Sequence, residues 1–182
     1  MTYDVVLLDP PWPYTGDPNK NAAAGKHYEL MDWEDIYNLD IKKYCNKKAW
    51  VCVWATCPLL DRQLKVFERW GLHYRGVGFQ WVKTRMDGGI ISGQGVPCSF
   101  TKPTTELFLV GSTIKNGRPL PLLDHGMGQV VLSPRGKHSE KPRAFQDKIV
   151  ELFGDVPRIE LFARENYPGW DAVGLELNGM TV

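Results

Sequence analysis

The sequence has few features of a secreted, metal-binding or membrane protein. Its N-terminus lacks a basic segment followed by a long apolar stretch, and no apolar run is long enough to span a membrane. The four cysteines show no Cys-x-x-Cys pair and no Cys/His grouping; they are Cys45, Cys52, Cys57 and Cys98. We interpret them as reduced thiols and expect neither a disulfide framework nor a metal site. These absences predict a cytoplasmic protein without a membrane partner.

An excess of charge of one sign is also absent, because 22 Lys and Arg side chains face 21 Asp and Glu side chains, for a net charge of +1. The distribution is nevertheless uneven. Residues 83–143 carry nine cations against four carboxylates, a net of +5, whereas residues 144–182 carry three against seven, a net of −4. The cations of the middle region either form a positive surface for phosphates or are solvated loop charges.

The chain length and composition suit one domain, 1–182, with a sizeable core. Of the 182 residues 43% are hydrophobic and seven are Trp, which indicates a compact globule. We find no internal repeat, low-complexity tract or linker that would mark a second domain.

Apolar runs and periodicity predict alternating strands and helices. We expect strands over Tyr3–Leu8, 49–54, 72–82, 106–110, 129–132 and 158–162. We expect helices over 58–70 and 142–153, and a short helix that starts near Trp33 and that Asp32 can cap. Gly71 and Gly154 should end the two longer helices. Since continuous apolar strands are typical of parallel sheets, we predict an α/β fold with a mostly parallel sheet flanked by helices.

The first predicted strand runs directly into Asp9-Pro10-Pro11-Trp12. An exocyclic amine on a base ring is a poor nucleophile, and the Asp9 carboxylate and the Pro10 carbonyl can accept its two N–H bonds. Pro11 fixes its own φ and restricts Pro10 to extended geometry, which holds that carbonyl in place. Trp12 offers a flat face on which a flipped base can stack. The tetrapeptide therefore suits methylation of such an amine; the alternative is a strand that ends in an ordinary proline turn.

The chain resembles the MT-A70 family of S-adenosylmethionine (SAM)-dependent adenine N6-methyltransferases. The resemblance rests on three segments in the family's order: Asp9 to Trp12, His138-Ser139-Glu140-Lys141-Pro142, and Glu160-Leu161-Phe162-Ala163-Arg164 followed by Gly169-Trp170-Asp171. Weaker matches between them are Trp54-Ala55-Thr56, Trp81-Val82-Lys83, and Glu106 before a strand that ends in Gly111.

The resemblance implies a Rossmann-like methyltransferase fold in which the catalytic motif precedes the cofactor motif. The glycine loop that other methyltransferases carry after their first strand is absent, and the family uses the strand end at 160–164 in its place. Asp9, Pro10, Pro11 and Trp12 are implied to be catalytic. The implied SAM-binding residues are Asp9, Lys141, Glu160, Phe162, Arg164, Asn166 and Glu176.

Particular roles follow for four of these residues. Lys141, at a helix start, suits the methionine carboxylate, and Glu160 suits the ribose hydroxyls. Arg164 and Asn166 suit the ribose or the methionine. Each has an ordinary alternative, because Lys141 can be a solvated charge, Glu160 can pair with Arg158, and Arg164 can form a surface ion pair.

The implied activity is methylation of adenine N6 in DNA by a compact enzyme of the phage or bacterial kind, acting in a bacterium or an infected host cell. Trp12 and Tyr14 are candidates to hold the base, and Lys83 and Arg85 to hold phosphates. If the cations of 83–143 bind phosphates, they should crowd around Asp9. The polar, glycine-rich segments 13–27 and 84–104 should be mobile without substrate and fold over the base.

Three alternatives stay open at this point. The same chemistry can act on RNA, the chain can be a non-catalytic nucleic-acid-binding partner, or it can methylate glutamine or a small amine. A homodimer or a second subunit is compatible with so short a chain. Two departures from the family pattern bear on the cofactor contacts: Asn166 and Leu175-Glu176 replace the His and Asn-Gln of related eukaryotic RNA enzymes, and Gly136-Lys137 separates Arg135 from His138.

Overall fold

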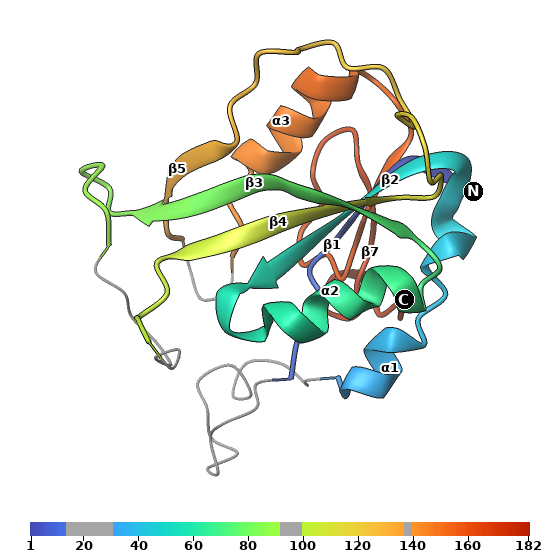
Figure 1. Ribbon diagram of the computed structural model, residues 1–182, viewed down its shortest axis with the longest axis horizontal. Helices are drawn as coiled ribbons and strands as arrows, with labels where there is room; N and C mark the ends of the chain where they lie inside the picture. Colours follow the sequence, from blue (N-terminus) through green and yellow to red (C-terminus); the bar gives the residue numbers. More distant parts are fainter. Residues whose placement is uncertain (14–30, 92–99, 137–139) are drawn as a thin grey trace.

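The computed structural model describes residues 1–13, 31–91, 100–136 and 140–182 (Figure 1). Its centre is a seven-stranded sheet with the strand order β5-β3-β4-β2-β1-β6-β7. The strands are β1 (Tyr3–Leu8), β2 (Cys45–Thr56), β3 (His73–Thr84), β4 (Thr105–Ser112), β5 (Val130–Pro134), β6 (Arg158–Leu161) and β7 (Asp171–Val173).

The sheet is parallel except for β4, which runs antiparallel to both β2 and β3. The ends of β1, β2, β3 and β6 therefore meet at one edge of the sheet, and the start of β4 lies at this same edge. Ligands of open α/β sheets bind at such an edge. The mixed α/β fold with a mostly parallel sheet is confirmed.

Two hydrophobic cores form, one on each face of the sheet. Val6 and Leu8 of β1 pack into the core that contains Val66 and Phe67 of helix α2 (Leu60–Arg69). Val5 and Leu7 pack into the core on the other face, with Phe145 and Ile149 of helix α3 (Ala144–Phe153). Figure 1 shows α2 and α3 on opposite sides of the sheet. Both faces of β1 are therefore buried, which explains why its sequence is continuously apolar.

The remaining helices are short. They are α1 (Trp33–Tyr37), α4 (Leu175–Asn178) and two 3-10 turns, Ile41–Tyr44 and Cys57–Leu59. None of the described helices is long and apolar enough to cross a membrane. Gly71 and Gly154, which have φ of 64° and 73°, follow α2 and α3 as predicted.

Several boundaries differ from the prediction. β2 begins at Cys45, four residues before the expected start, because Cys45 already pairs with Tyr3; the register then shifts before Val5 pairs with Trp50. β7 and α4 were not predicted; β7 has only three residues and is held by pairing with β6. Asp32 occupies the N-cap position of α1, but its side chain makes no capping hydrogen bond, so its expected role was wrong.

The glycine-rich segment after β3 is partly regular. β3 continues to Thr84, and a turn follows in which the Arg85 N–H donates to the Gly89 carbonyl at 2.8 Å and the Ile91 N–H donates to the Lys83 carbonyl at 3.0 Å. Residues 92–99 and 14–30 lie outside the described part of the chain, so the expected mobility of these segments stays a prediction.

Candidate active site

The sequence motifs meet at the carboxyl edge of the sheet. Asp9 to Trp12 follow β1, and Thr56 ends the neighbouring strand β2. Glu106 pairs with Thr56 in register because β4 is antiparallel. Lys141, which precedes α3, reaches the same place across 132 residues of sequence.

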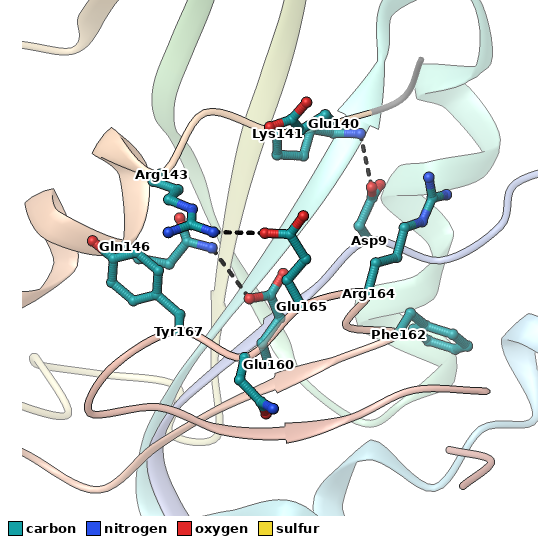
Figure 2. Close-up of a pocket in the computed structure, with 11 residues that line it drawn as sticks. Asp9, Glu140, Lys141, Arg143, Gln146, Glu160, Phe162, Arg164, Glu165 and Tyr167 are labelled. Atoms are coloured by element: carbon teal, nitrogen blue, oxygen red, sulfur yellow. Dashed lines mark hydrogen bonds and ion pairs between the residues drawn. The ribbon is translucent and has the colours of Figure 1, made fainter. Parts of the chain in front are cut away.

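Two carboxylates and two ammonium groups form an ion cluster there. Lys141 Nζ lies 2.8 Å from Asp9 Oδ2 and 3.4 Å from Glu106 Oε2, and the first of these contacts is drawn in Figure 2. Lys83 Nζ lies 2.5 Å from Glu106 Oε1. The Lys141 ammonium also stands over the Trp54 ring, 5.6 Å from its centroid. Only 12% of the Lys141 side chain is exposed, so the alternative of a solvated charge before the helix was wrong.

Burial and charge act in opposite directions on these groups. Burial raises the pKa of Asp9, and the Lys141 ammonium opposes that rise. Burial also acts to raise the pKa of Glu106, but Lys141 and Lys83 outweigh it, so this pKa is lowered. The pKa of Lys141 is raised, because the two carboxylates overcome the effect of burial. Lys141 is therefore the main group that favours a charged Asp9.

Two cavities adjoin this cluster. The larger has a volume of about 210 Å³, and Figure 2 shows its lining. Its residues come from β1, α3, β6 and the segments beside them; they are Asp9, Glu140, Lys141, Arg143, Gln146, Glu160, Phe162, Arg164, Glu165, Asn166 and Tyr167. The smaller is lined by Asp9, Pro10, Pro11, Trp12, Trp54, Ala55, Thr56, Glu106, Lys141 and Arg164. Asp9, Lys141 and Arg164 line both, so the two cavities meet at the Asp9 carboxylate.

The tetrapeptide after β1 is firmly anchored. The Trp12 N–H donates to the Pro10 carbonyl at 2.8 Å, which leaves the second lone pair of this oxygen as an acceptor. The Trp12 indole N–H donates to the Trp54 carbonyl at 3.0 Å, and its ring stacks on Trp33 with 5.6 Å between centroids. Trp12 is only 5% exposed. In this conformation little of the Trp12 ring is accessible to a base. The stacking role of Trp12 therefore stays a prediction.

The end of β6 forms the opposite wall. Glu160 accepts a hydrogen bond from Gln146 Nε2 at 3.1 Å (Figure 2). Burial raises the pKa of Glu160, and the bond from Gln146 opposes that rise. The alternative that Glu160 pairs with Arg158 was wrong, because Arg158 donates to the carbonyls of Gly154 and Val156 and to Asp155 instead.

The backbone after β6 is constrained. Phe162 has φ of 61° and is the one non-glycine residue with positive φ in the described ranges. Such a conformation costs of order 1–3 kcal/mol and clusters at binding sites. Beside it, the Ala163 N–H donates to the Val173 carbonyl at 3.0 Å. A Cβ on Gly174 would lie 1.9 Å from the Ala163 carbonyl oxygen, so glycine is required there for space.

Gly174→Ala should lower the free energy of unfolding by about 1–3 kcal/mol, because the added methyl group forces the β7 end and the strand end at 162–164 apart. Urea denaturation measures the loss, and Gly128→Ala is the matched control, since nothing lies within 4 Å of a Cβ at Gly128. Equal stability of the two variants would contradict the close approach.

Most residues implied by the resemblance come together here. Asp9, Lys141, Glu160, Phe162, Arg164 and Asn166 line the larger cavity, and Pro10, Pro11 and Trp12 line the smaller one. Lys83 joins the cluster through Glu106. Arg85 lines neither cavity; it pairs with Asp87 on an exposed turn. Tyr14 and His138 lie outside the described residues, as does the side chain of Glu176 in α4.

The expected crowding of cations around Asp9 is only partly present. Lys83, Lys141 and Arg143 lie at the site. Lys115 and Arg118 follow β4 at the far end of the strands, where the Lys115 carbonyl accepts a hydrogen bond from Arg75. The expectation was wrong for these two, because the antiparallel strand carries the chain away from the site. Lys137 lies outside the described residues.

Some lining residues were not predicted to be functional. Gln146 touches Glu160, while Arg143 pairs with Glu165 at 2.6 Å and Tyr167 donates to Asp147 at 2.5 Å. Glu106 was noted as a family match without a role. No local signal marks these residues, since each depends on which segment lies across the cavity.

Comparisons with known proteins agree with this arrangement. The sequence pattern of the MT-A70 family matches residues 3–176. The chain is 30% identical to the type II methyltransferase M.MunI of Mycoplasma sp over 96% of its length and 78% of that protein.

Two longer relatives are more distant. The chain is 26% identical to the human N(6)-adenine-specific methyltransferase METTL4, and 24% identical to the Drosophila melanogaster METTL14, a non-catalytic subunit of N(6)-adenosine-methyltransferase. The alignments cover 97% and 96% of the chain but only 38% and 46% of those proteins, so the chain spans less than half of each. With a match over nearly all of its length, and with the matched motifs gathered around one carboxylate, the chain belongs to the MT-A70 family.

Proposed function

We propose that this chain transfers a methyl group from SAM to the N6 amine of adenine in DNA. The observation that supports it best is the pair of cavities that meet at Asp9. The motif for an amine lines one of them, and the residues implied for the cofactor line the other. A carboxylate in the shared wall is placed to hold an amine against a methyl donor.

The larger cavity has the chemistry that SAM requires. Lys141 offers a cation for the methionine carboxylate, and Glu160 offers a carboxylate for the ribose hydroxyls. Phe162 contributes an apolar wall, and Arg164 and Asn166 add hydrogen-bond donors. Glu176 is proposed from the resemblance alone. The cofactor supplies an electrophilic methyl group, and the chain supplies binding and orientation.

The amine is held by two acceptors. Asp9 Oδ2 is bonded to Lys141, which leaves Oδ1 for one N–H of the amine. The Pro10 carbonyl, fixed by Pro11 and by the Trp12 N–H, accepts the other. With both N–H bonds directed at acceptors, the nitrogen lone pair is turned toward the methyl group. SAM held by Lys141, Glu160 and Arg164 would supply the electrophilic methyl group, and the chain would contribute to the rate mainly by positioning the amine through Asp9 and the Pro10 carbonyl.

DNA is proposed over RNA because the similarity to M.MunI, a type II methyltransferase, covers most of both chains. The relatives also include an N6-methyladenosine RNA methyltransferase from Cryphonectria parasitica, at 25% identity over 52% of that protein. The non-catalytic alternative, suggested by METTL14, is disfavoured by the carboxylate at position 9 in the wall between the cavities. Among the proposed nucleic-acid contacts, Arg85, whose pair with Asp87 is exposed, suits a phosphate better than Lys83, whose pair with Glu106 is largely buried.

The purified chain should methylate DNA oligonucleotides and leave matched RNA unmodified. Transfer of labelled methyl from SAM to duplex DNA, single-stranded DNA and RNA of one sequence, with nucleoside analysis of the product, makes the comparison. N6-methyldeoxyadenosine as the sole product supports the proposal. Methyl transfer to RNA alone would reassign the substrate, and activity that needs an added protein would point to a second subunit.

A further inference from the structure

Helix α3 holds the cofactor side of the site through a row of side chains. Arg143 bonds Glu165, Gln146 bonds Glu160, and Asp147 bonds Tyr167. Figure 2 shows the first two contacts, from the N-cap residue Arg143 to the segment after β6 and from Gln146 of α3 to Glu160 of β6. Gln146 differs from the other two helix residues, since it is only 7% exposed and its partner is the carboxylate proposed for the ribose.

Packing alone does not account for a carboxamide at this position. Within the described residues, Gln146 Oε1 is buried and has no hydrogen-bond partner. Burial of an unpaired amide oxygen is unfavourable, and an apolar side chain of similar size would fill the same space without that penalty. The neighbouring buried positions of α3, Phe145 and Ile149, are apolar. The feature that requires a carboxamide is the donor that it directs at Glu160.

The bond constrains Glu160 in a useful way. Gln146 Nε2 is 3.1 Å from Glu160 Oε2, which fixes the rotation of the carboxylate and leaves Oε1 for a ligand. A donor on one oxygen also favours the charged form of the carboxylate against burial. A charged, oriented carboxylate is the group that binds a pair of vicinal hydroxyls well.

We propose that Gln146 is a positioning residue that sets Glu160 to recognise the ribose hydroxyls of the cofactor, and so determines how strongly this site requires them. The inference rests on the proposed function, because it takes the larger cavity to be the SAM site. It assigns Gln146 no contact with the reacting atoms.

The test is ligand discrimination rather than activity. Isothermal calorimetry on the full chain would compare S-adenosylhomocysteine with its analogue that lacks both ribose hydroxyls. Gln146→Met keeps the length of the side chain and removes the donor. We expect it to weaken binding of S-adenosylhomocysteine by about tenfold, as for loss of one hydrogen bond to a charged group, and to bind the dideoxy analogue nearly as the unaltered chain does.

Two further variants separate positioning from stability. Gln63→Leu is the matched control, because Gln63 is also a buried carboxamide on a helix, but it bonds Thr56 rather than Glu160. It should keep the ratio of the two affinities. Gln146→Asn retains the carboxamide but is one methylene too short to reach Glu160, so it should lose discrimination as Gln146→Met does. If Gln146→Met does not fold, Gln146→Asn still tests the role of Gln146.

A pH series adds a readout that a merely structural role would not move. Without the Gln146 donor, the pKa of Glu160 rises further, so binding of S-adenosylhomocysteine should begin to weaken at a higher pH as the solution is made more acid.

The outcomes distinguish the two proposals. If the unaltered chain binds no S-adenosylhomocysteine, the proposed function fails. If it binds but both Gln146 variants keep its ratio of affinities and its pH profile, the inference about Gln146 fails while the proposed function stands.

Discussion

Replacing Asp9 with alanine should reduce methyl transfer at least about 10²–10³-fold, the loss typical for removal of one preorganised electrostatic contact from an active site. Asp9 lies in the wall shared by the two cavities, and its carboxylate is the acceptor that we propose for an N–H of the target amine. SAM binding should survive, although weakened, because most residues that line the larger cavity come from the segment before α3 and the segment after β6.

The Asp9→Asn variant tests the charge itself. It keeps the shape of the side chain and one oxygen acceptor, but it removes the negative charge that pairs with Lys141. We expect it to lose most of the activity while it keeps the fold. Glu34→Ala is the matched control, because it also breaks a carboxylate–cation pair, the exposed one with Arg69, and neither of these residues lines a cavity. Labelled methyl transfer and calorimetry with SAM decide the matter; appreciable turnover by Asp9→Ala would remove Asp9 from the mechanism.

The sequence predicted the fold well where the signal is local. The apolar run of β1 and the spacing of Leu60, Leu64 and Phe67 in α2 follow from burial of one face or of both faces, so pattern alone located them. The glycines that end α2 and α3 were found for the same reason. β7 was missed because three residues carry no periodicity, and its existence depends on pairing with β6.

The site was predictable only through motifs. Family resemblance named six residues of the larger cavity, but it did not indicate their partners. The resemblance matched Lys141 with a ligand carboxylate, but it did not indicate that Lys141 also pairs with Asp9, directly after β1, and with Glu106 of β4. The sequence indicated nothing about Gln146 beyond a polar residue in a helix. Contacts of this kind depend on which strands are neighbours, and the antiparallel direction of β4, which brings Glu106 to the site, has no local signature in the sequence.

Replacing Lys141 with methionine should both abolish SAM binding and make stability depend strongly on pH. Lys141 opposes the effect of burial on Asp9, so its loss leaves a buried carboxylate beside Glu106 without its main cation. Removal of one partner from a buried ion pair typically costs about 3–5 kcal/mol. Protonation of Asp9 can reduce that cost. Without Lys141, the pKa of Asp9 in the folded variant rises further above its value in the unfolded chain.

The sign of the pH effect follows from this rise. Between the unfolded pKa of Asp9, about 3.9, and the higher folded pKa in the variant, the folded state binds more protons than the unfolded state, so stability falls as pH increases. The free energy of unfolding of Lys141→Met should therefore fall further below that of the unaltered chain at pH 8 than at pH 5. Urea unfolding at both pH values measures it, with Lys115→Met as the control, since Lys115 lies beyond the far end of β4. An equal deficit at the two pH values would show that Lys141 does not govern the charge of Asp9.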